Sequence, residues 1–191
     1  MINSTKDIKN FLEDKKFKKI FILCGKKSFY NSGAKIFFKN LLKDKDKEIK
    51  SFYKVSEFPV IDELINIIND IRKFKPNLIL AVGGGTIIDY AKIANLVEYR
   101  DDLKNLIVNY SYPYKKKYTN LAVIPTTAGS GAEVTSNAVI YVDKIKYSCE
   151  SELLKPDYFF LIPDFLISAP NKIKASTGFD AIAQALESMI S

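Results

Sequence analysis

The stretch from Asn77 to Lys92 constrains the fold of this chain more than any other, because an apolar run, three glycines and a helical pattern follow one another. The run over 78–82 carries no charge, which is typical of a strand covered on both faces in a parallel sheet. The glycines occupy 83–85, and apolar residues then recur at helical spacing over 86–97. A strand, a glycine turn and a helix in this order present backbone amides to an anion. The stretch therefore predicts a phosphate site.

The glycine triplet alone leaves a second interpretation open. The dinucleotide fingerprint G-x-G-x-x-G is met at Gly83 and Gly85 but not at its last position, where Ile88 stands. Three glycines can also serve only to turn a strand tightly into a helix.

Strand and helix patterns alternate through the first part of the chain. Strands are expected over 18–25, 49–55, 78–82, 121–124 and 158–162, helices over 34–42, 60–74, 86–97 and 101–108, and a hairpin over 138–149. This alternation predicts an α/β fold with a Rossmann-like, doubly wound, mostly parallel sheet. Such sheets bind ligands at the carboxyl ends of their strands, where Gly25 and the glycine triplet both fall. Pro163 and Pro170 mark a change of organisation, and the sequence is helical from Asn171 onward.

Composition excludes several classes of protein. No apolar run reaches the length of a membrane span, and the N-terminus lacks the apolar core of a signal peptide, so we expect a cytoplasmic protein without a membrane partner. The two cysteines form no metal or redox pattern. The net charge of +7 is spread among acidic residues, and the basic aromatic stretch over 111–119 is interpreted as an exposed loop, so no nucleic acid is expected. Histidine is absent, which removes the commonest general base and metal ligand.

A second informative stretch runs from Pro125 to Thr135. Its hydroxyls at Thr126, Thr127 and Ser130 stand among the glycines at 129 and 131. Such hydroxyls can cap a helix, or they can donate to phosphate and amide oxygens of a ligand. Both interpretations suit the same geometry.

Three separated motifs together resemble the iron-containing alcohol dehydrogenase family. They are Gly83-Gly-Gly-Thr-Ile-Ile-Asp-Tyr-Ala-Lys92, Pro125-Thr-Thr-Ala-Gly-Ser-Gly-Ala-Glu-Val-Thr135 and Ala175-Ser-Thr-Gly-Phe-Asp-Ala-Ile-Ala-Gln-Ala-Leu-Glu187. The resemblance covers the whole chain but only about the first half of a typical member. It implies a dinucleotide-binding domain over 1–168, and over 169–191 the first helix of a truncated, all-helical C-terminal domain for metal and substrate.

The resemblance also implies roles for single residues. The pyrophosphate of a nicotinamide cofactor would lie on Gly83, Gly84, Gly85 and Thr86, with Asp89 supporting the turn. Thr126, Thr127 and Ser130 would contact the phosphate, ribose or nicotinamide side of the cofactor. Lys146 matches a lysine near the active site of the family and is the catalytic candidate.

The end of the first predicted strand bears on the choice between NAD and NADP. Family members that prefer NAD tend to carry an acidic residue there, because a carboxylate accepts from the ribose 2′-hydroxyl and repels a 2′-phosphate. Here Gly25 is followed by Lys26, Lys27 and Ser28, so NADP is favoured over NAD.

The metal site departs from the family pattern. The family holds iron or zinc with an aspartate, a histidine four residues later and two further histidines downstream. Asp180 matches the aspartate, Gln184 occupies the histidine position, and the sequence stops at Ser191 before the other two. An amide oxygen is a poor ligand for these metals, so the chain as written is not expected to bind catalytic metal well.

These observations predict the cofactor-binding half of an NAD(P)-dependent alcohol dehydrogenase or aldehyde reductase, which transfers hydride to a small aldehyde, and an isolated chain that is inactive. The third motif is similar to the branch that includes phosphonoacetaldehyde reductases, which implies a small anionic aldehyde. Two alternatives stay open: a nucleotide-binding fragment without catalysis, and a lyase of the dehydroquinate synthase kind, although the stretch from Pro125 to Thr135 fits dehydrogenases better. A homodimer also stays open.

Overall fold

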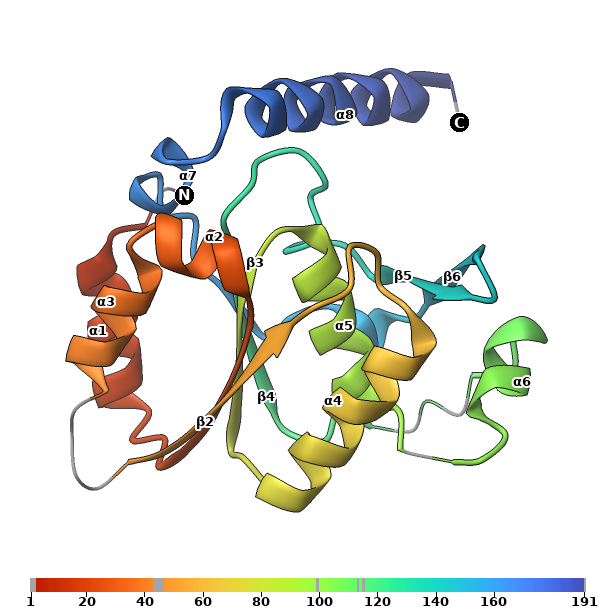
Figure 1. The fold of residues 1–191 in the computed structure, drawn as a ribbon, viewed down its shortest axis with the longest axis horizontal. Helices are drawn as coiled ribbons and strands as arrows, with labels where there is room; N and C mark the ends of the chain where they lie inside the picture. Colours follow the sequence, from red (N-terminus) through yellow and green to blue (C-terminus); the bar gives the residue numbers. More distant parts are fainter. Residues whose placement is uncertain (1–2, 43–46, 99, 113, 115, 191) are drawn as a thin grey trace.

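The computed structural model describes residues 3–42, 47–98, 100–112, 114 and 116–190 as an α/β fold (Figure 1). Residues 113 and 115 of the expected loop over 111–119 lie outside the described part. In chain order the elements are α1 (Thr5–Asp14), β1 (Lys19–Gly25), α2 (Lys26–Asn31), α3 (Ala34–Leu41), β2 (Glu48–Lys54), α4 (Ile61–Phe74), β3 (Leu78–Gly83), α5 (Gly85–Leu96), α6 (Leu103–Val108), β4 (Asn120–Pro125), β5 (Asn137–Val142), β6 (Ile145–Glu150), the 3-10 helix η1 (Glu152–Leu154), β7 (Tyr158–Phe159), α7 (Asp164–Ile167) and α8 (Asn171–Ile190).

The main sheet has the strand order β2-β1-β3-β4-β7, and every neighbouring pair in it is parallel. Parallel neighbours need crossover connections, and α4 and α5 supply them on one face. The expected doubly wound, mostly parallel sheet is confirmed. The expected hairpin is confirmed too, because β5 and β6 pair antiparallel with Val142 opposite Ile145.

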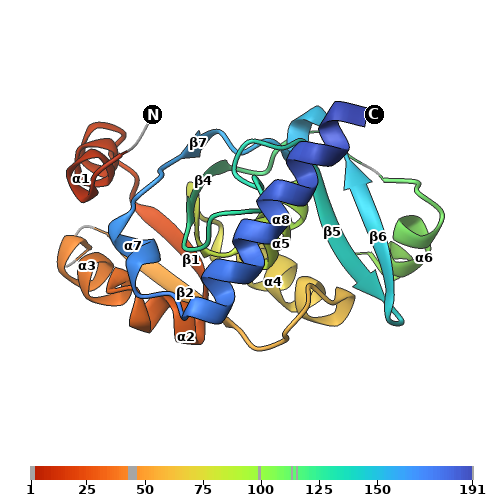
Figure 2. The same cartoon turned by 90° about the horizontal axis from the view of Figure 1, so that it is seen from above.

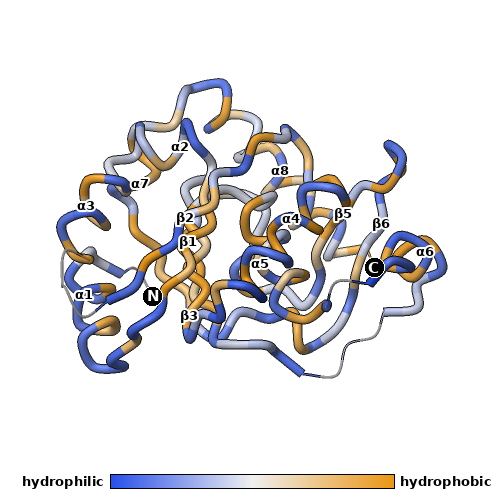
Figure 3. The backbone as a smooth tube through the Cα atoms, turned by 60° about the horizontal axis from the view of Figure 1, so that its bottom comes forward, coloured by the Kyte–Doolittle hydropathy of each residue, from blue (hydrophilic) through white to orange (hydrophobic). Residues whose placement is uncertain are grey.

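Two apolar cores cover the two faces of the sheet, as expected for strands that are apolar throughout. Along β1, Phe21 and Leu23 point into the core beneath α4 and α5. Ile20, Ile22 and Cys24 point into the opposite core, which also holds side chains of α1 and α3. Figure 3 shows the central strands as the most hydrophobic part of the trace.

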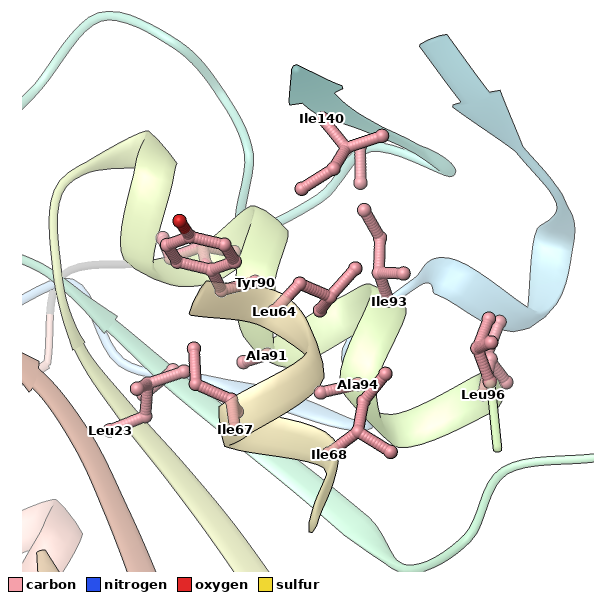
Figure 4. Packing of buried hydrophobic residues seen from close by; sticks show 14 of the residues in the cluster. Leu23, Leu64, Ile67, Ile68, Tyr90, Ala91, Ile93, Ala94, Leu96 and Ile140 are labelled. Carbon is pink, nitrogen blue, oxygen red and sulfur yellow. The ribbon is translucent and has the colours of Figure 1, made fainter. Parts of the chain in front are cut away.

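The packing of α4 against α5 fixes the helix that follows the glycine turn. Ile67 and Ile68 of α4 and Ala91 and Ala94 of α5 are fully buried, and Figure 4 shows them facing one another. Ile140 of β5 covers the other side of the same cluster. Because α5 is enclosed in this way, the turn at its start has a fixed position.

Three differences from the sequence-based expectations concern α1, α2 and β7. Helices α1 and α2 were not expected, and β7 covers only two of the residues expected over 158–162. Within the part of the chain that the structure describes, the backbone of Leu161 forms hydrogen bonds with Asn3 and not with a neighbouring strand. Leu161 N–H donates to Asn3 Oδ1 (3.0 Å), and Asn3 N–H donates to Leu161 O (2.9 Å).

Helix α8 passes above the carboxyl ends of the strands (Figures 1 and 2). None of its described residues is buried. In the described ranges, no helix combines the length and the apolar character that crossing a membrane requires. The expected division of the chain at residue 168 stays a prediction.

Candidate functional site

The glycine turn joins β3 directly to α5. Strand β3 ends at Gly83, Gly84 caps the helix with an extended backbone, and α5 begins at Gly85. A Cβ at Gly83 would lie 2.5 Å from Cγ1 of Ile87, so only glycine fits that position without a shift of the helix. The amides of the first turn of α5 therefore open toward the space above the sheet.

The stretch from Pro125 to Thr135, which we call the hydroxyl loop, packs against this turn. The backbone N–H of Thr126 donates to the carbonyl of Gly83 (3.0 Å). A Cβ at Gly84 would lie 3.0 Å from Thr127 Oγ1, and a Cβ at Gly85 would lie 3.0 Å from Ser130 Oγ. The structure thus brings together the two motifs that the sequence singled out.

A cavity of about 860 Å³ lies between the hydroxyl loop, the segment that follows β7, and α8. Its wall is mostly apolar and is formed by Pro125, Thr126, Thr127, Ala128, Gly129, Gly131, Glu133, Leu161, Ile162, Pro163, Leu166, Ile167, Ala169, Ile173, Lys174, Thr177, Gly178 and Ala181. Figure 2 shows α8 crossing above α5, with β4 to one side.

Thr126 is the polar anomaly in that wall. Its side chain is only 3% exposed, and among the described residues its Oγ1 atom has no hydrogen-bond partner. Buried hydroxyls nearly always have a partner, so an orphaned one in a cavity wall is available to an atom of a ligand or to a water molecule.

The hydroxyl loop also contacts α8. A Cβ at Gly129 would collide with the backbone carbonyl of Thr177. The ammonium of Lys174 donates to the carbonyl of Ile167 (2.7 Å), which ties α8 to α7. The wall of the cavity is therefore built from two stretches of the sequence, 125–133 and 161–181.

Asp89 lies one helical turn beyond the glycines and faces β5. Burial raises the pKa of this carboxyl to about 6, although the charges of Lys92 and Lys146 and a bond from the backbone of Val139 favour the ionised form. Its contacts therefore include the hairpin, and its expected support of the glycine turn stays a prediction.

Lys92 is a residue to which the sequence assigned no role. Its side chain is fully buried, and its Nζ donates to Thr135 O (2.9 Å), Thr135 Oγ1 (3.0 Å) and Asn137 O (3.0 Å). Burial lowers its pKa to about 8, against the opposing charges of Asp89 and Glu133. The signal in the sequence was a lysine inside an otherwise apolar stretch of helix.

Gly25 and Lys26 lie at the same edge of the sheet as the glycine turn. Gly25 ends β1 beside Lys54 of β2, and Lys26 begins α2. The Lys54 ammonium donates to the carbonyl of Glu57 (2.8 Å). This edge carries positive charge next to Gly25.

The catalytic and metal candidates lie apart from the glycine turn in the sequence and on other elements. Lys146 is exposed on β6, opposite Tyr141. Asp180 and Gln184 are exposed on α8, one turn apart. Throughout the described residues, no three His, Cys, Asp or Glu side chains gather closely enough to hold a metal ion. One carboxylate and one amide do not fit iron or zinc, so the residues described here do not form a metal centre by themselves.

Comparison with known proteins places these features in a family. The family model described as iron-containing alcohol dehydrogenase matches residues 2–163. The 4-hydroxybutyrate dehydrogenase of Clostridium kluyveri is 38% identical over 133 residues, which cover 68% of this chain and 35% of that protein. The NADPH-dependent butanol dehydrogenase of Clostridium saccharobutylicum is 29% identical over 187 residues, which cover 94% of this chain and 47% of that protein.

Solved structures agree with this assignment. The crystal structure of sulfoacetaldehyde reductase from Bifidobacterium kashiwanohense in complex with NAD+ superposes with a TM-score of 0.84 at 27% identity, and the match covers 98% of this chain and 50% of that one. The chain spans less than half the length of the two curated relatives above. The match over 2–163 includes the glycine turn and the hydroxyl loop, and the chain belongs to the iron-containing alcohol dehydrogenase family of oxidoreductases.

Proposed function

We propose that this chain binds NAD(P)(H) at the carboxyl edge of its parallel sheet, as the cofactor-binding part of an alcohol dehydrogenase or aldehyde reductase. The observation that carries the proposal is the orphaned Oγ1 of Thr126 in the cavity wall, beside the glycine turn. Family membership supports it, and so do the NAD+ complex of a structural neighbour and the NADPH dependence in the name of a relative.

Different residues bind different parts of the cofactor in this proposal. The amides of Gly84, Gly85 and Thr86 at the start of α5 hold the pyrophosphate, because a helix N-terminus favours negative charge. The hydroxyls of Thr126 and Thr127 donate to the ribose or the nicotinamide amide. The bound cofactor supplies the hydride, while the apolar wall formed by Leu161, Ile162 and Leu166 excludes water from it.

The edge beside Gly25 supports a preference for NADP over NAD. A 2′-phosphate next to Gly25 would meet the charges of Lys26 and Lys54, with no side chain at residue 25 in the way. The amide and carboxylate of α8 do not fit a metal, so no step of the proposal passes through one.

The substrate in the proposal is a small aldehyde or alcohol, the class named in the relatives. The narrower choice of an anionic aldehyde, such as phosphonoacetaldehyde, is supported only by the sulfoacetaldehyde reductase neighbour. A cytoplasmic location and a homodimer belong to the proposal as predictions. The match to a dehydrogenase family favours this function over that of a lyase.

Fluorescence titration of the purified chain with NADPH and with NADH tests the proposal. We expect saturable binding, tighter for NADPH, and binding about tenfold weaker in Thr126→Val, as the loss of one hydrogen bond costs roughly 1.4 kcal/mol. Thr5→Val, which makes the same change on α1, is the matched control and keeps wild-type affinity. If neither nucleotide binds the wild-type chain, the proposal is wrong.

A further inference from the structure

The ammonium group of Lys92 lies inside the protein and forms hydrogen bonds there. All three donors of its ammonium are satisfied, by Thr135 O, Thr135 Oγ1 and Asn137 O at 2.9–3.0 Å. The side chain is fully buried. A buried lysine of this kind is costly, because its charge leaves water, and so its position calls for an explanation.

The acceptors of Lys92 lie where the hydroxyl loop ends and β5 begins. Thr135 is the last residue of that loop, and Asn137 is the first residue of β5. The other end of the loop is held by the bond from Thr126 N–H to the carbonyl of Gly83 (3.0 Å). The loop is therefore fastened at both ends to the same unit, β3 with α5.

The helix geometry also places Gly85 in line with Lys92. Gly85 and Lys92 are separated by about two helical turns, so they lie on one face of α5. Gly85 lies beside Ser130 in the middle of the loop, where an added Cβ would come within 3.0 Å of Ser130 Oγ, and Lys92 holds the end of the loop. The carboxylates of Asp89 and Glu133 favour the charged form of Lys92 from two sides, one on the helix and one on the loop.

We infer that Lys92 is a positioning residue for the proposed cofactor site: its ammonium holds the hydroxyl loop against α5, so that Thr126 and Thr127 stay aimed at the ligand. The inference rests on the proposed function. Lys92 lies below the loop and is absent from the cavity wall, so it acts through the loop and not on the ligand itself. Nothing else in the described part of the chain bonds to Thr135 Oγ1.

Lys92→Met tests the inference, because methionine keeps most of the length of the side chain and removes the charge and all three donors. We expect NADPH to bind at least tenfold more weakly, and amide hydrogen exchange over 126–137 to speed up at least tenfold. Thr135→Val removes only one of the three bonds, keeps Lys92, and should give a smaller effect of the same kind. It also serves if Lys92→Met does not fold.

A control separates positioning from general loss of stability. Leu12→Ala removes buried volume in the core on the opposite face of the sheet. All titrations are run where urea unfolding shows each variant to be folded. Leu12→Ala should lower the unfolding midpoint without changing the affinity for NADPH or hydrogen exchange over 126–137.

The outcomes distinguish the inference from the function beneath it. Wild-type affinity in Lys92→Met, with unchanged exchange in the loop, overturns the positioning role and leaves the proposed function standing. Equal losses of affinity in Lys92→Met and Leu12→Ala also overturn it, because the effect would then be one of stability. A wild-type chain that binds no nicotinamide nucleotide overturns the proposed function.

Discussion

The hydroxyl of Tyr90 donates to Oε2 of Glu63 at 3.1 Å, and this bond joins α5 to α4. The same hydroxyl accepts from the backbone N–H of Val60 (2.7 Å). Glu63 accepts further bonds from the N–H groups of Val55 (2.6 Å) and Ser56 (3.1 Å). Burial raises the pKa of Glu63, but these bonds outweigh burial and the net pKa is lowered. The network fixes the connection between β2 and α4 against the helix that carries the glycine turn.

Tyr90→Phe should destabilise the protein by about 1–3 kcal/mol, because it leaves the partly buried N–H of Val60 without its acceptor. Urea unfolding followed by far-UV circular dichroism measures the loss. Tyr30→Phe, in an exposed ring on α2, is the matched control and should change stability by less than about 0.5 kcal/mol. Equal effects of the two changes would contradict the role assigned to the network.

Thr126→Val should affect the stability of the protein and its affinity for NADPH in different ways. In the absence of ligand the variant is expected to be as stable as the wild type, or more stable by about 1 kcal/mol, since it removes a buried hydroxyl without a partner. Binding of NADPH should weaken at the same time. Thermal unfolding with and without NADPH measures both effects in one experiment, and a variant that is clearly destabilised without ligand would show that Oγ1 has a partner inside the protein.

Because the pKa of Asp89 is raised in the folded protein, its contribution to the free energy of unfolding should fall as pH rises. Its pKa in the folded protein is about 6, above the ordinary value of 3.8, so its contribution is full below 3.8 and is lost as pH rises through 6. Asp89→Asn removes this titration. The free energy of unfolding of the variant, relative to that of the wild type, should rise by about 2 kcal/mol between about pH 4 and about pH 7.

Urea unfolding of both proteins across that range gives the difference at each pH. The other carboxyls titrate in both proteins, so their contributions cancel in the difference. A difference that stays constant with pH, or that shrinks as pH rises, would show that Asp89 does not have a raised pKa.

The turn between β5 and β6 holds backbone strain that a glycine substitution should relieve. Asp143 and Lys144 have φ values of 47° and 68°, the left-handed pair that a two-residue hairpin requires and that glycine adopts without cost. Lys144→Gly should raise stability by about 1 kcal/mol and the midpoint of thermal unfolding by about 2–4 °C. Lys144→Ala removes the same charge but keeps the Cβ, so it should bring no such gain, and equal gains would assign the effect to charge.

The parallel sheet could be predicted because its strands are apolar on both faces and its helices have clear periodicity. Helix α1 was missed although its signals were present: Ser4 and Asp7 form a capping box, and Ile8 and Leu12 lie one turn apart and are buried. The short length of β7 could not have been predicted, because Leu161 bonds to Asn3, which lies 158 residues away in the sequence.

The site was predictable where one local motif suffices. The glycine turn and the hydroxyl loop were each identified from their residues, and the structure places them in contact at Gly83 and Thr126, while their role in binding stays a prediction. The role of Lys92 could not be predicted in this way, since its acceptors at Thr135 and Asn137 lie more than forty residues away along the chain. Their proximity depends on how β5 packs on α5.

The bonds between Asn3 and Leu161 have a practical consequence. Leu161 belongs to the wall of the cavity, so Asn3 is hydrogen-bonded to the backbone of that wall. A small fluorophore attached close to Asn3 would lie near this cavity, and a change in its emission on addition of NADPH would test the proposed binding without any change to the glycine turn or the hydroxyl loop. A bulky fusion placed there without a linker would instead press on the wall itself.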